Sequence, residues 1–235
     1  MTATEVLEQL EQLGTEQTRK TWLRHGAKGA FFGVKIGDMK PIQKRIKIDY
    51  NLAKELFASG NSDAMYLAGL ISDPAKMTRA DLDNWAETAT WNMISEYSVA
   101  WTAAESPLGF EAALDWINSP EPQIASTGWA TLANWVALAQ NDNKNIEKIN
   151  QLLDRVEDEI FLSPNRVRYT MNNFVICVGA YAESLSEKAI TIGAKIGKVE
   201  VDMSGTSCKV PFAPDYIKNS IARGSFTKKK KTVKC

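Results

Sequence analysis

A tryptophan and two serines share one face of a helix that the sequence predicts for residues 87–101. In the segment ETATWNMISEYSVAW, Trp91, Ser95 and Ser98 follow one another at spacings of four and three, which place side chains on the same side of an α-helix. A tryptophan ring beside small polar groups can stack on a base or a sugar, an interaction of ~1–3 kcal/mol per stacked base. The ring can equally pack between helices, and the spacing leaves both interpretations of Trp91 open.

Polar side chains also interrupt a predicted helix over residues 163–184, SPNRVRYTMNNFVICVGAYAES. Ser163 can cap this helix, because a serine hydroxyl accepts hydrogen bonds from the free amides of the first turn. Apolar residues recur every three and four positions, so one face belongs to the core. Asparagine is unfavourable in a helix interior because its amide competes for backbone hydrogen bonds. Four polar side chains nevertheless lie in this helix: Arg168, Tyr169, Asn172 and Asn173. This polar group indicates either contact with a ligand or hydrogen bonds to neighbouring helix ends.

Basic side chains gather near both ends of the chain. A short helix, MKPIQKRI, carries Lys40, Lys44 and Arg45, which could hold phosphate groups or form a solvated face. Residues 228–231 are consecutive lysines, and such a run predicts a disordered tail. A disordered basic tail can still add affinity for a polyanion through counterion release.

The net charge is zero, but its distribution along the chain is uneven. Residues 1–50 carry 9 basic and 6 acidic side chains, residues 51–199 carry 11 and 19, and residues 200–235 carry 8 and 3. The balances of these segments are +3, −8 and +5. Proteins that bind polyanions without specificity are more often basic overall. A nucleic-acid surface on this chain must therefore be local.

Several features of the sequence argue against a membrane span, a secretory signal and a metal site. No apolar run is long enough to span a bilayer, and the acidic N-terminus does not resemble a secretory signal. The cysteines Cys177, Cys208 and Cys235 are scattered. Because His25 is also the only histidine, we expect no metal, no cofactor and a reducing, cytoplasmic location. Cys177 is a predicted core residue, and Cys208, beside Lys209, is a candidate reactive thiol.

Helical periodicity recurs along almost the whole chain and predicts an all-α fold. Ser-Pro pairs open predicted helices at residues 119–120 and 163–164, 44 residues apart, which lies within the ~40–47-residue period of HEAT and armadillo helix pairs. The segments 124–132 and 167–175 can be superimposed, and 65–71 is a more distant copy. We therefore predict a HEAT-like or armadillo-like α-α superhelix of antiparallel helix pairs, whose second helices line the concave side.

This architecture places the polar residues and sets a domain boundary. The second helices, including one predicted over residues 120–140, would carry Ser126, Trp129 and the polar group described above on the concave surface. The helical pattern breaks near residue 197. We therefore predict a HEAT-like repeat domain over residues 1–197 and a C-terminal extension over residues 198–235. The extension would hold a short strand, KVEVDM, then a short helix and the basic tail.

Four segments carry a resemblance to a known family. They are GVKIGDMKPIQKRI (33–46), TWNMISEY (90–97), IASTGWATL (124–132) and VRYTMNNFVICVGAYAE (167–183). Together they resemble the bacterial DNA alkylation repair proteins of the AlkD type, which are HEAT-like repeat DNA glycosylases. The resemblance implies binding along the duplex backbone and excision of cationic N3- and N7-alkylated purines without deep base flipping. In active members it implies a tryptophan, an aspartate four residues later, and an arginine from the next repeat helix.

The family's site positions fall on different residue types in this chain. The tryptophan corresponds to Trp91, the aspartate to Ser95 and, in an ungapped comparison of the repeats, the arginine to Ser126. Glu96 adjoins the aspartate position but is turned about 100° around an α-helix. Base excision leaves an oxocarbenium-like sugar that a nearby carboxylate stabilises. A serine hydroxyl cannot supply that charge.

The leading hypothesis is therefore a DNA-binding relative of these glycosylases in which the usual catalytic pair is replaced. It would act as a monomer and hold duplex or branched DNA, damaged or alkylated, in a concave groove. One alternative is a HEAT-repeat scaffold for protein interactions, which the acidic middle section and the zero net charge favour. Another is an active glycosylase for cationic alkylated purines that uses Glu96. The sequence leaves enzymatic activity open.

Overall fold

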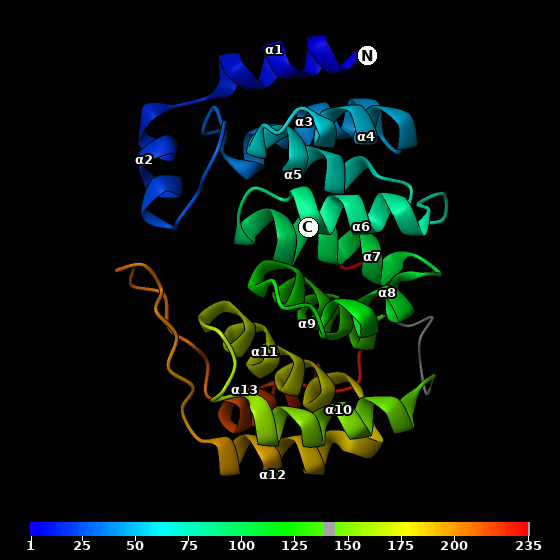
Figure 1. Cartoon of the computed structure of the whole chain (residues 1–235), viewed down its shortest axis with the longest axis vertical. Helices are drawn as coiled ribbons and strands as arrows, with labels where there is room; N and C mark the ends of the chain where they lie inside the picture. Colours follow the sequence, from blue (N-terminus) through cyan, green and yellow to red (C-terminus); the bar gives the residue numbers. More distant parts are fainter. Residues whose placement is uncertain (139–143, 235) are drawn as a thin grey trace.

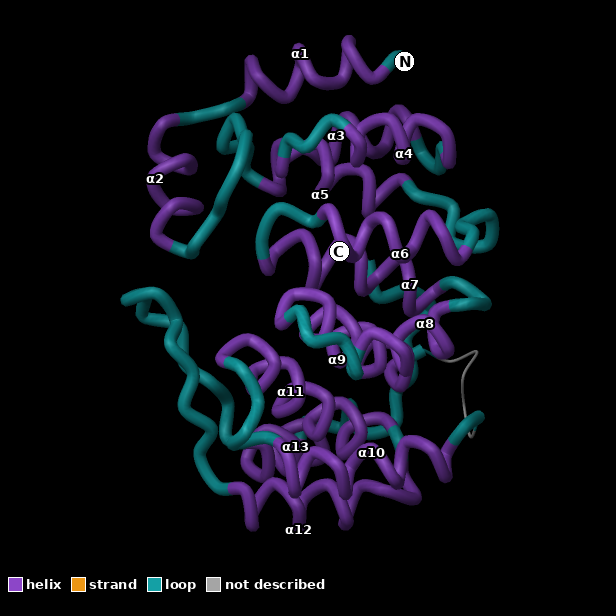
Figure 2. The backbone as a smooth tube through the Cα atoms, viewed as in Figure 1, coloured by secondary structure: helices purple, strands orange, loops and turns teal. Residues whose placement is uncertain are grey.

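A computed structural model of the chain describes residues 1–138 and 144–234, and the regular elements within these ranges are all helices (Figures 1 and 2). The prediction of an all-α fold is confirmed. None of the described helices is both long and apolar enough to cross a membrane. In chain order the elements are α1 (Ala3–Leu13), α2 (Glu16–Arg24), α3 (Ile36–Ile46), α4 (Tyr50–Ala58), α5 (Ser62–Ile71), α6 (Arg79–Thr88), the π-helix η1 (Ile94–Val99), α7 (Ala100–Glu105), α8 (Gly109–Trp116), α9 (Pro122–Ala137), α10 (Ile146–Glu159), α11 (Asn165–Tyr181), the 3-10 helix η3 (Glu183–Leu185), α12 (Ser186–Ile196) and α13 (Ala213–Ala222).

The helices stack in pairs along the long axis of the molecule (Figure 1). An inner layer runs through α3, α5, η1 with α7, α9, α11 and α13, because each of these contacts the next along the stack. In the outer layer α1 contacts α4, α6 contacts α8, and α10 contacts α12. This is the predicted HEAT-like stack of helix pairs. The helix predicted over residues 120–140 is α9, which ends at Ala137, whereas residues 139–140 and Cys235 lie outside the described ranges.

Side-chain caps define the start of several helices, but not of α9 and α11. Thr78 and Asp81 form a capping box at the start of α6. The N-cap residues of α9 and α11 are Glu121 and Pro164, and neither makes a side-chain cap hydrogen bond. Ser163 does not cap α11 as predicted, because its hydroxyl donates to the carbonyl of the last residue of α10 instead. The first-turn amides of α9 and α11 therefore have no capping side chain.

The C-terminal tail, residues 225–234, is docked on the stack, so the prediction of a disordered lysine run is wrong. It reaches the C-terminal ends of α11, α9, α7 and α5 in turn. Lysine ammonium groups and free amides suit these positions, because the last carbonyls of a helix are unpaired and carry partial negative charge. The hydrogen bonds are Thr227 N to Ala180 O (3.0 Å), Lys230 N to Ala137 O (2.8 Å), Val233 N to Glu105 Oε1 (2.8 Å) and Lys234 Nζ to Ser72 O (2.8 Å).

The short strand predicted for KVEVDM is also wrong, because residues 198–203 are irregular. Asn165 at the start of α11 takes the place of a strand partner. Its Nδ2 donates to the carbonyl of Asp202 (2.9 Å), and its Oδ1 accepts from the amide of the same residue (2.7 Å). One side-chain amide thus pairs the backbone groups that a second strand would otherwise pair, and it ties the extension to α11.

We expect Gly128→Ala to destabilise the fold, because Gly128 lets α9 approach α8 closely. A methyl group at this position would lie 2.8 Å from the backbone nitrogen of Ile117 and 2.9 Å from the carbonyl oxygen of Ala113. Overpacking of this kind lowers the free energy of unfolding by ~1–3 kcal/mol. The control is Gly37→Ala in α3, where a methyl group would meet nothing within 4 Å. Urea unfolding followed by circular dichroism compares the two variants, and an unchanged midpoint for Gly128→Ala would contradict the close packing.

Candidate nucleic-acid interface

Cavities open along the inner layer at three neighbouring levels. The N-terminal cavity, of about 310 Å³, lies at the starts of η1, α9 and α11. The middle cavity, of about 200 Å³, lies between η1 with α7, α9 and α11. The tail cavity, of about 400 Å³, is lined by α9, α11, α13 and the C-terminal tail. Asn134 and Asn173 line both the middle and the tail cavity, so these two cavities adjoin.

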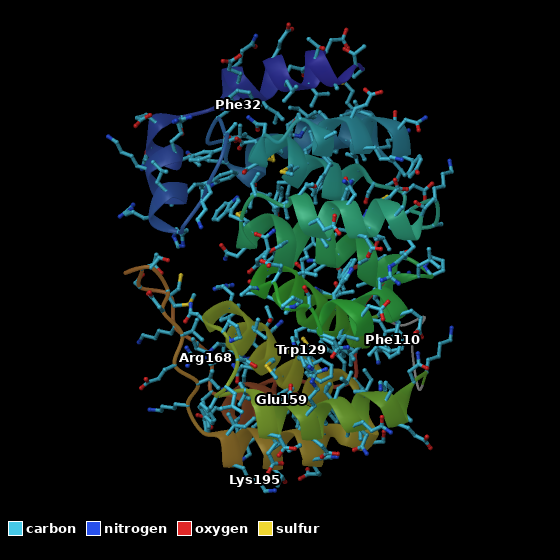
Figure 3. The ribbon with its side chains drawn as sticks, in the orientation of Figure 1. Phe32, Phe110, Trp129, Glu159, Arg168 and Lys195 are labelled. Carbon is cyan, nitrogen blue, oxygen red and sulfur yellow. The ribbon has the colours of Figure 1, made fainter. Side chains whose placement is uncertain are left out.

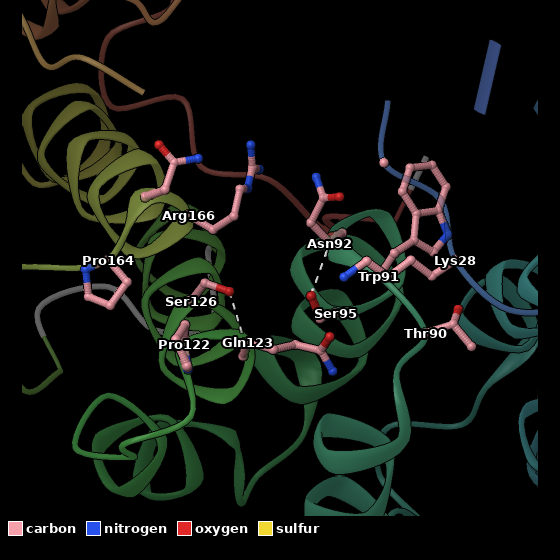
Figure 4. Close-up of a pocket in the computed structure, with 12 residues that line it drawn as sticks. Lys28, Thr90, Trp91, Asn92, Ser95, Pro122, Gln123, Ser126, Pro164 and Arg166 are labelled. Atoms are coloured by element: carbon pink, nitrogen blue, oxygen red, sulfur yellow. Dashed lines mark hydrogen bonds between the residues drawn. The ribbon is translucent and has the colours of Figure 1, made fainter. Parts of the chain in front are cut away.

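The N-terminal cavity has the features of an anion site. It is lined by residues at the starts of α9 and α11, including Gln123, Ser126 and Pro164 (Figure 4). The uncapped first turns of these helices present free amides and the positive ends of their dipoles. Lys28, which is exposed, and Arg166 add cationic side chains to the lining. No carboxylate is found among the described residues that line this cavity.

The structure brings the three family positions together at this cavity, since Trp91, Ser95 and Ser126 all line it (Figure 4). The ring of Trp91 is only 5% exposed and packs against Trp22, with ring centroids 5.6 Å apart. Most of the ring therefore serves helix packing. Its Nε1 is buried and has no hydrogen-bond partner among the described residues. A role for these residues in DNA binding stays a prediction.

Glu96 points in a different direction from Ser95, as the sequence analysis expected for adjacent residues of a helix. Residues 94–99 form a π-helix instead of the predicted α-helix, and its smaller rotation per residue does not bring the two side chains to the same face. Ser95 lines the N-terminal cavity, whereas Glu96 lines the middle cavity. Glu96 is 5% exposed and forms a two-pronged ion pair with Arg166 of α11. The Nε of Arg166 donates to Oε1 at 2.9 Å, and its Nη2 donates to Oε2.

This ion pair separates the N-terminal cavity from the middle cavity. Burial raises the pKa of the Glu96 carboxyl, while the Arg166 guanidinium and the Ser126 hydroxyl act in the opposite direction. Arg166 also lies over the ring of Tyr169, 4.3 Å from its centroid. Sequence reasoning missed Arg166 and chose Arg168 from the same turn. A search for the cationic partner of Glu96 could have found Arg166, because a buried carboxylate requires such a partner.

Three of the predicted groove residues are buried, and their placement on the concave surface was wrong. Ser126 lines the N-terminal cavity but is only 1% exposed, and its hydroxyl donates to the carbonyl of Gln123 (2.9 Å). Trp129 is 1% exposed and packs edge-on against Phe174 at 5.2 Å, and the guanidinium of Arg155 from the outer layer lies over its ring. Asn172 is 4% exposed and its Nδ2 donates to the carbonyl of Pro211 (3.0 Å). The alternative that the amides bond inside the fold therefore holds for Asn172. Figure 3 shows Trp129 within the stack.

The other predicted contacts are accessible to different degrees. Asn173 is exposed, and Tyr169 is half-buried at the middle cavity. Arg168 is half-buried, and its Nε lacks a hydrogen-bond partner among the described residues. The basic residues of α3 that we predicted to hold phosphates are Lys40, Lys44 and Arg45, and all three are exposed. None of them lines the N-terminal, middle or tail cavity. The guanidinium of Arg45 donates to the side chain of Gln9 in α1.

The stack of helix pairs along the described residues defines a HEAT-like repeat protein. The chain belongs to the DNA alkylation repair enzyme family, whose sequence profile matches residues 6–209. It is 34% identical to the uncharacterized protein Lin0241 of Listeria innocua and 33% identical to the uncharacterized protein Lmo0209 of Listeria monocytogenes. Each alignment spans 90% of this chain and 94% of the relative.

A solved structure is similar over the whole chain. It represents a new family of proteins related to the HEAT-like repeat DNA glycosylases with affinity for branched DNA structures. The TM-score is 0.91, the sequence identity is 38%, and each chain is covered completely. The predicted resemblance to alkylation-repair glycosylases is therefore confirmed at the level of family and fold.

We expect Arg166→Ala to destabilise the fold in a pH-dependent manner. The variant leaves the buried Glu96 carboxylate unpaired, which costs ~3–5 kcal/mol when it is ionised. Without Arg166, burial raises the folded-state pKa of Glu96 above its unfolded value. Stability is then lost as the pH rises from the unfolded pKa through the folded pKa, so the penalty is smaller near pH 5 than at pH 8.

Urea unfolding of the wild type and the variant at both pH values measures this difference. Arg168→Ala is the matched control, because it removes an arginine of the same helix that makes no ion pair with Glu96, and its effect should not depend on pH. An equal loss of stability at both pH values for Arg166→Ala would show that Glu96 does not depend on Arg166 for its charge.

Proposed function

We propose that this protein binds branched DNA through the inner layer of its helical stack and does not excise alkylated bases. The observation that carries the proposal is the composition of the N-terminal cavity, which offers cations and free helix amides at the family's site positions but no carboxylate among its described lining residues. The relationship to a structure whose family has affinity for branched DNA supports the choice of ligand.

Phosphate groups are the ligands that this cavity suits best. The first turns of α9 and α11 supply amides without capping side chains, and phosphates bind favourably at such helix starts. The ammonium of Lys28 supplies positive charge, and the guanidinium of Arg166, whose charge is balanced by Glu96, supplies N–H donors. These groups contact the backbone of a nucleic acid rather than its bases, so they would read the path of a strand and not its sequence.

A branch point suits the arrangement of the cavities better than a straight duplex does. The N-terminal and middle cavities lie on the two sides of the ion pair between Glu96 and Arg166. Two strands that diverge at a branch can place phosphates at the N-terminal cavity and sugar or base groups at the middle cavity, whose described lining holds Glu96 and no cation. A straight duplex keeps its backbone on one smooth path and would engage fewer of these groups.

Excision of a cationic base is not favoured by these residues. Such chemistry requires an anion beside the sugar as the glycosidic bond breaks. Ser95 carries no charge, and its hydroxyl is directed to the carbonyl of Asn92. Glu96 is the nearest candidate carboxylate, but it lines the other cavity and its two oxygens are occupied by Arg166. The protein would thus hold DNA without cleaving a glycosidic bond.

We expect tighter binding to a three-way DNA junction than to a linear duplex of equal length, with affinity that falls steeply as salt rises. Lys28→Glu should weaken junction binding and reduce the slope of log affinity against log salt by about 1. The control is Lys148→Glu, the same charge change at an exposed position of the outer helix α10. Fluorescence anisotropy with labelled DNA measures both. If no DNA binds at low salt, the chain is better described as a protein-interaction scaffold.

The basic face of α3 gives a second test of backbone binding. Combined substitution of Lys40, Lys44 and Arg45 by glutamate should reduce affinity for junctions of different sequence by the same factor, because phosphate contacts carry no sequence information. Electrophoretic mobility shift with two unrelated junction sequences measures this. Wild-type affinity in the triple variant would confine the interface to the cavities of the inner layer.

We expect the native protein to release 7-methylguanine and 3-methyladenine from alkylated DNA no faster than they are lost spontaneously. The absence of a preorganised electrostatic partner typically lowers a rate by ~10²–10³. Chromatography of released bases measures the rate for the native chain, for Ser95→Asp, which introduces a carboxylate at the family position, and for Glu96→Gln. Rapid release by the native chain that is lost in Glu96→Gln would overturn the proposal and identify Glu96 as the catalytic carboxylate.

A further inference from the structure

The tail cavity is separate from the family's site positions and has its own polar lining. Its volume is about 400 Å³, and it opens between α9, α11, α13 and the C-terminal tail. The charged residues in its described lining, Arg223 and Lys230, are both basic. The amides of Asn134, Asn173 and Asn219 and the rings of two tyrosines also face it. Cations, amides and aromatic rings are the groups that bind nucleic acid strands.

The basic side of this cavity is held in place by the docked tail. The backbone amide of Lys230 donates to the carbonyl of Ala137 at 2.8 Å, and the Nζ of Lys229 donates to the carbonyl of Val136 at 2.7 Å. The ammonium of Lys230 lies 5.8 Å from the ring centroid of Tyr181. Lys230 is nevertheless exposed, so its charge remains available to a ligand. A lysine anchored through its backbone loses less freedom on binding than one on a flexible tail.

The aromatic side of the cavity is open to solvent. Tyr216 of α13 is 55% exposed, although it belongs to a helix whose apolar face packs against α11. An exposed ring beside cations provides a stacking surface for a base. The thiol of Cys177 also lines the cavity, and burial raises its pKa to about 11, so it is neutral at pH 7 and does not repel phosphate.

The size of the cavity selects among nucleic acid ligands. A volume of about 400 Å³ is that of a site for a small molecule, so it can receive one or two nucleotides but not the width of a duplex. Asn134 and Asn173 connect the cavity to the middle cavity, which reaches the ion pair between Glu96 and Arg166. A strand that leaves a branch point near that pair can therefore continue into the tail cavity.

We propose that the tail cavity binds a single-stranded segment of a branched DNA, with a base stacked on Tyr216 and phosphates held by Arg223 and Lys230. This inference rests on the proposed function, because the strand enters from DNA bound on the inner layer. It adds a structural preference: a branched DNA with an unpaired arm should bind more tightly than one whose arms are all duplex.

The test uses the full chain and two labelled three-way junctions that differ only in whether one arm is single-stranded. The wild type should bind the junction with the unpaired arm more tightly. Tyr216→Ala should weaken that binding about 5- to 100-fold, the effect of losing one stacked base, and leave the all-duplex junction unaffected. Tyr216→Phe keeps the ring and should bind as the wild type does. Arg223→Glu should weaken binding of the same junction, with Lys148→Glu as the control.

The outcomes separate this inference from the proposed function. Equal affinity of the wild type for both junctions, or an unchanged affinity in Tyr216→Ala for the junction with the unpaired arm, would overturn the tail-cavity site while leaving DNA binding on the inner layer intact. Absence of binding to either junction would overturn the proposed function itself. Circular dichroism of each variant verifies that the fold is retained.

Discussion

The ion pair between Glu96 and Arg166 is the interaction on which the arrangement of the inner layer depends. It joins η1 to α11 across α9, two helices that are 70 residues apart along the chain. A carboxylate that is 5% exposed is tolerated only with a cationic partner and matched hydrogen bonds. Because the pair fixes where α11 begins relative to η1, it also fixes the N-terminal cavity on one side and the middle cavity on the other.

The same pairing is central to the proposed function. Both oxygens of the Glu96 carboxylate are bonded to Arg166, and Lys28 adds a cation to the lining of the N-terminal cavity. At the C-terminal ends of the inner helices, the partial negative charge of the last carbonyls is matched by positive groups of the chain itself. There the C-terminal tail brings lysines and amides to the terminal carbonyls of α5, α9 and α11. The helix starts are thus left open to anions, while the helix ends are paired within the protein.

The fold could be predicted from the sequence because it depends on a repeated apolar period, and that period survives in α9, α11 and most other helices. The site was predictable only in part. Trp91, Ser95 and Ser126 do share a cavity, since their relation depends on the repeat. The π-helix over residues 94–99 has no signature in apolar spacing, whereas the different directions of Ser95 and Glu96 were expected for adjacent residues of a helix. Burial of Trp129 and the pairing of Glu96 with Arg166 depend on contacts between distant segments, and the docked tail depends on free carbonyls that exist only in the assembled stack.

Hydrogen–deuterium exchange of the protein with and without a three-way DNA junction tests the central claim most directly, because it reports which backbone amides the DNA covers. The account predicts slower exchange on binding at the first turns of α9 and α11, around Gln123 and Arg166, and no change in the outer helices α8 and α10. Protection confined to the outer layer, with the first turns of α9 and α11 unaffected, would contradict it.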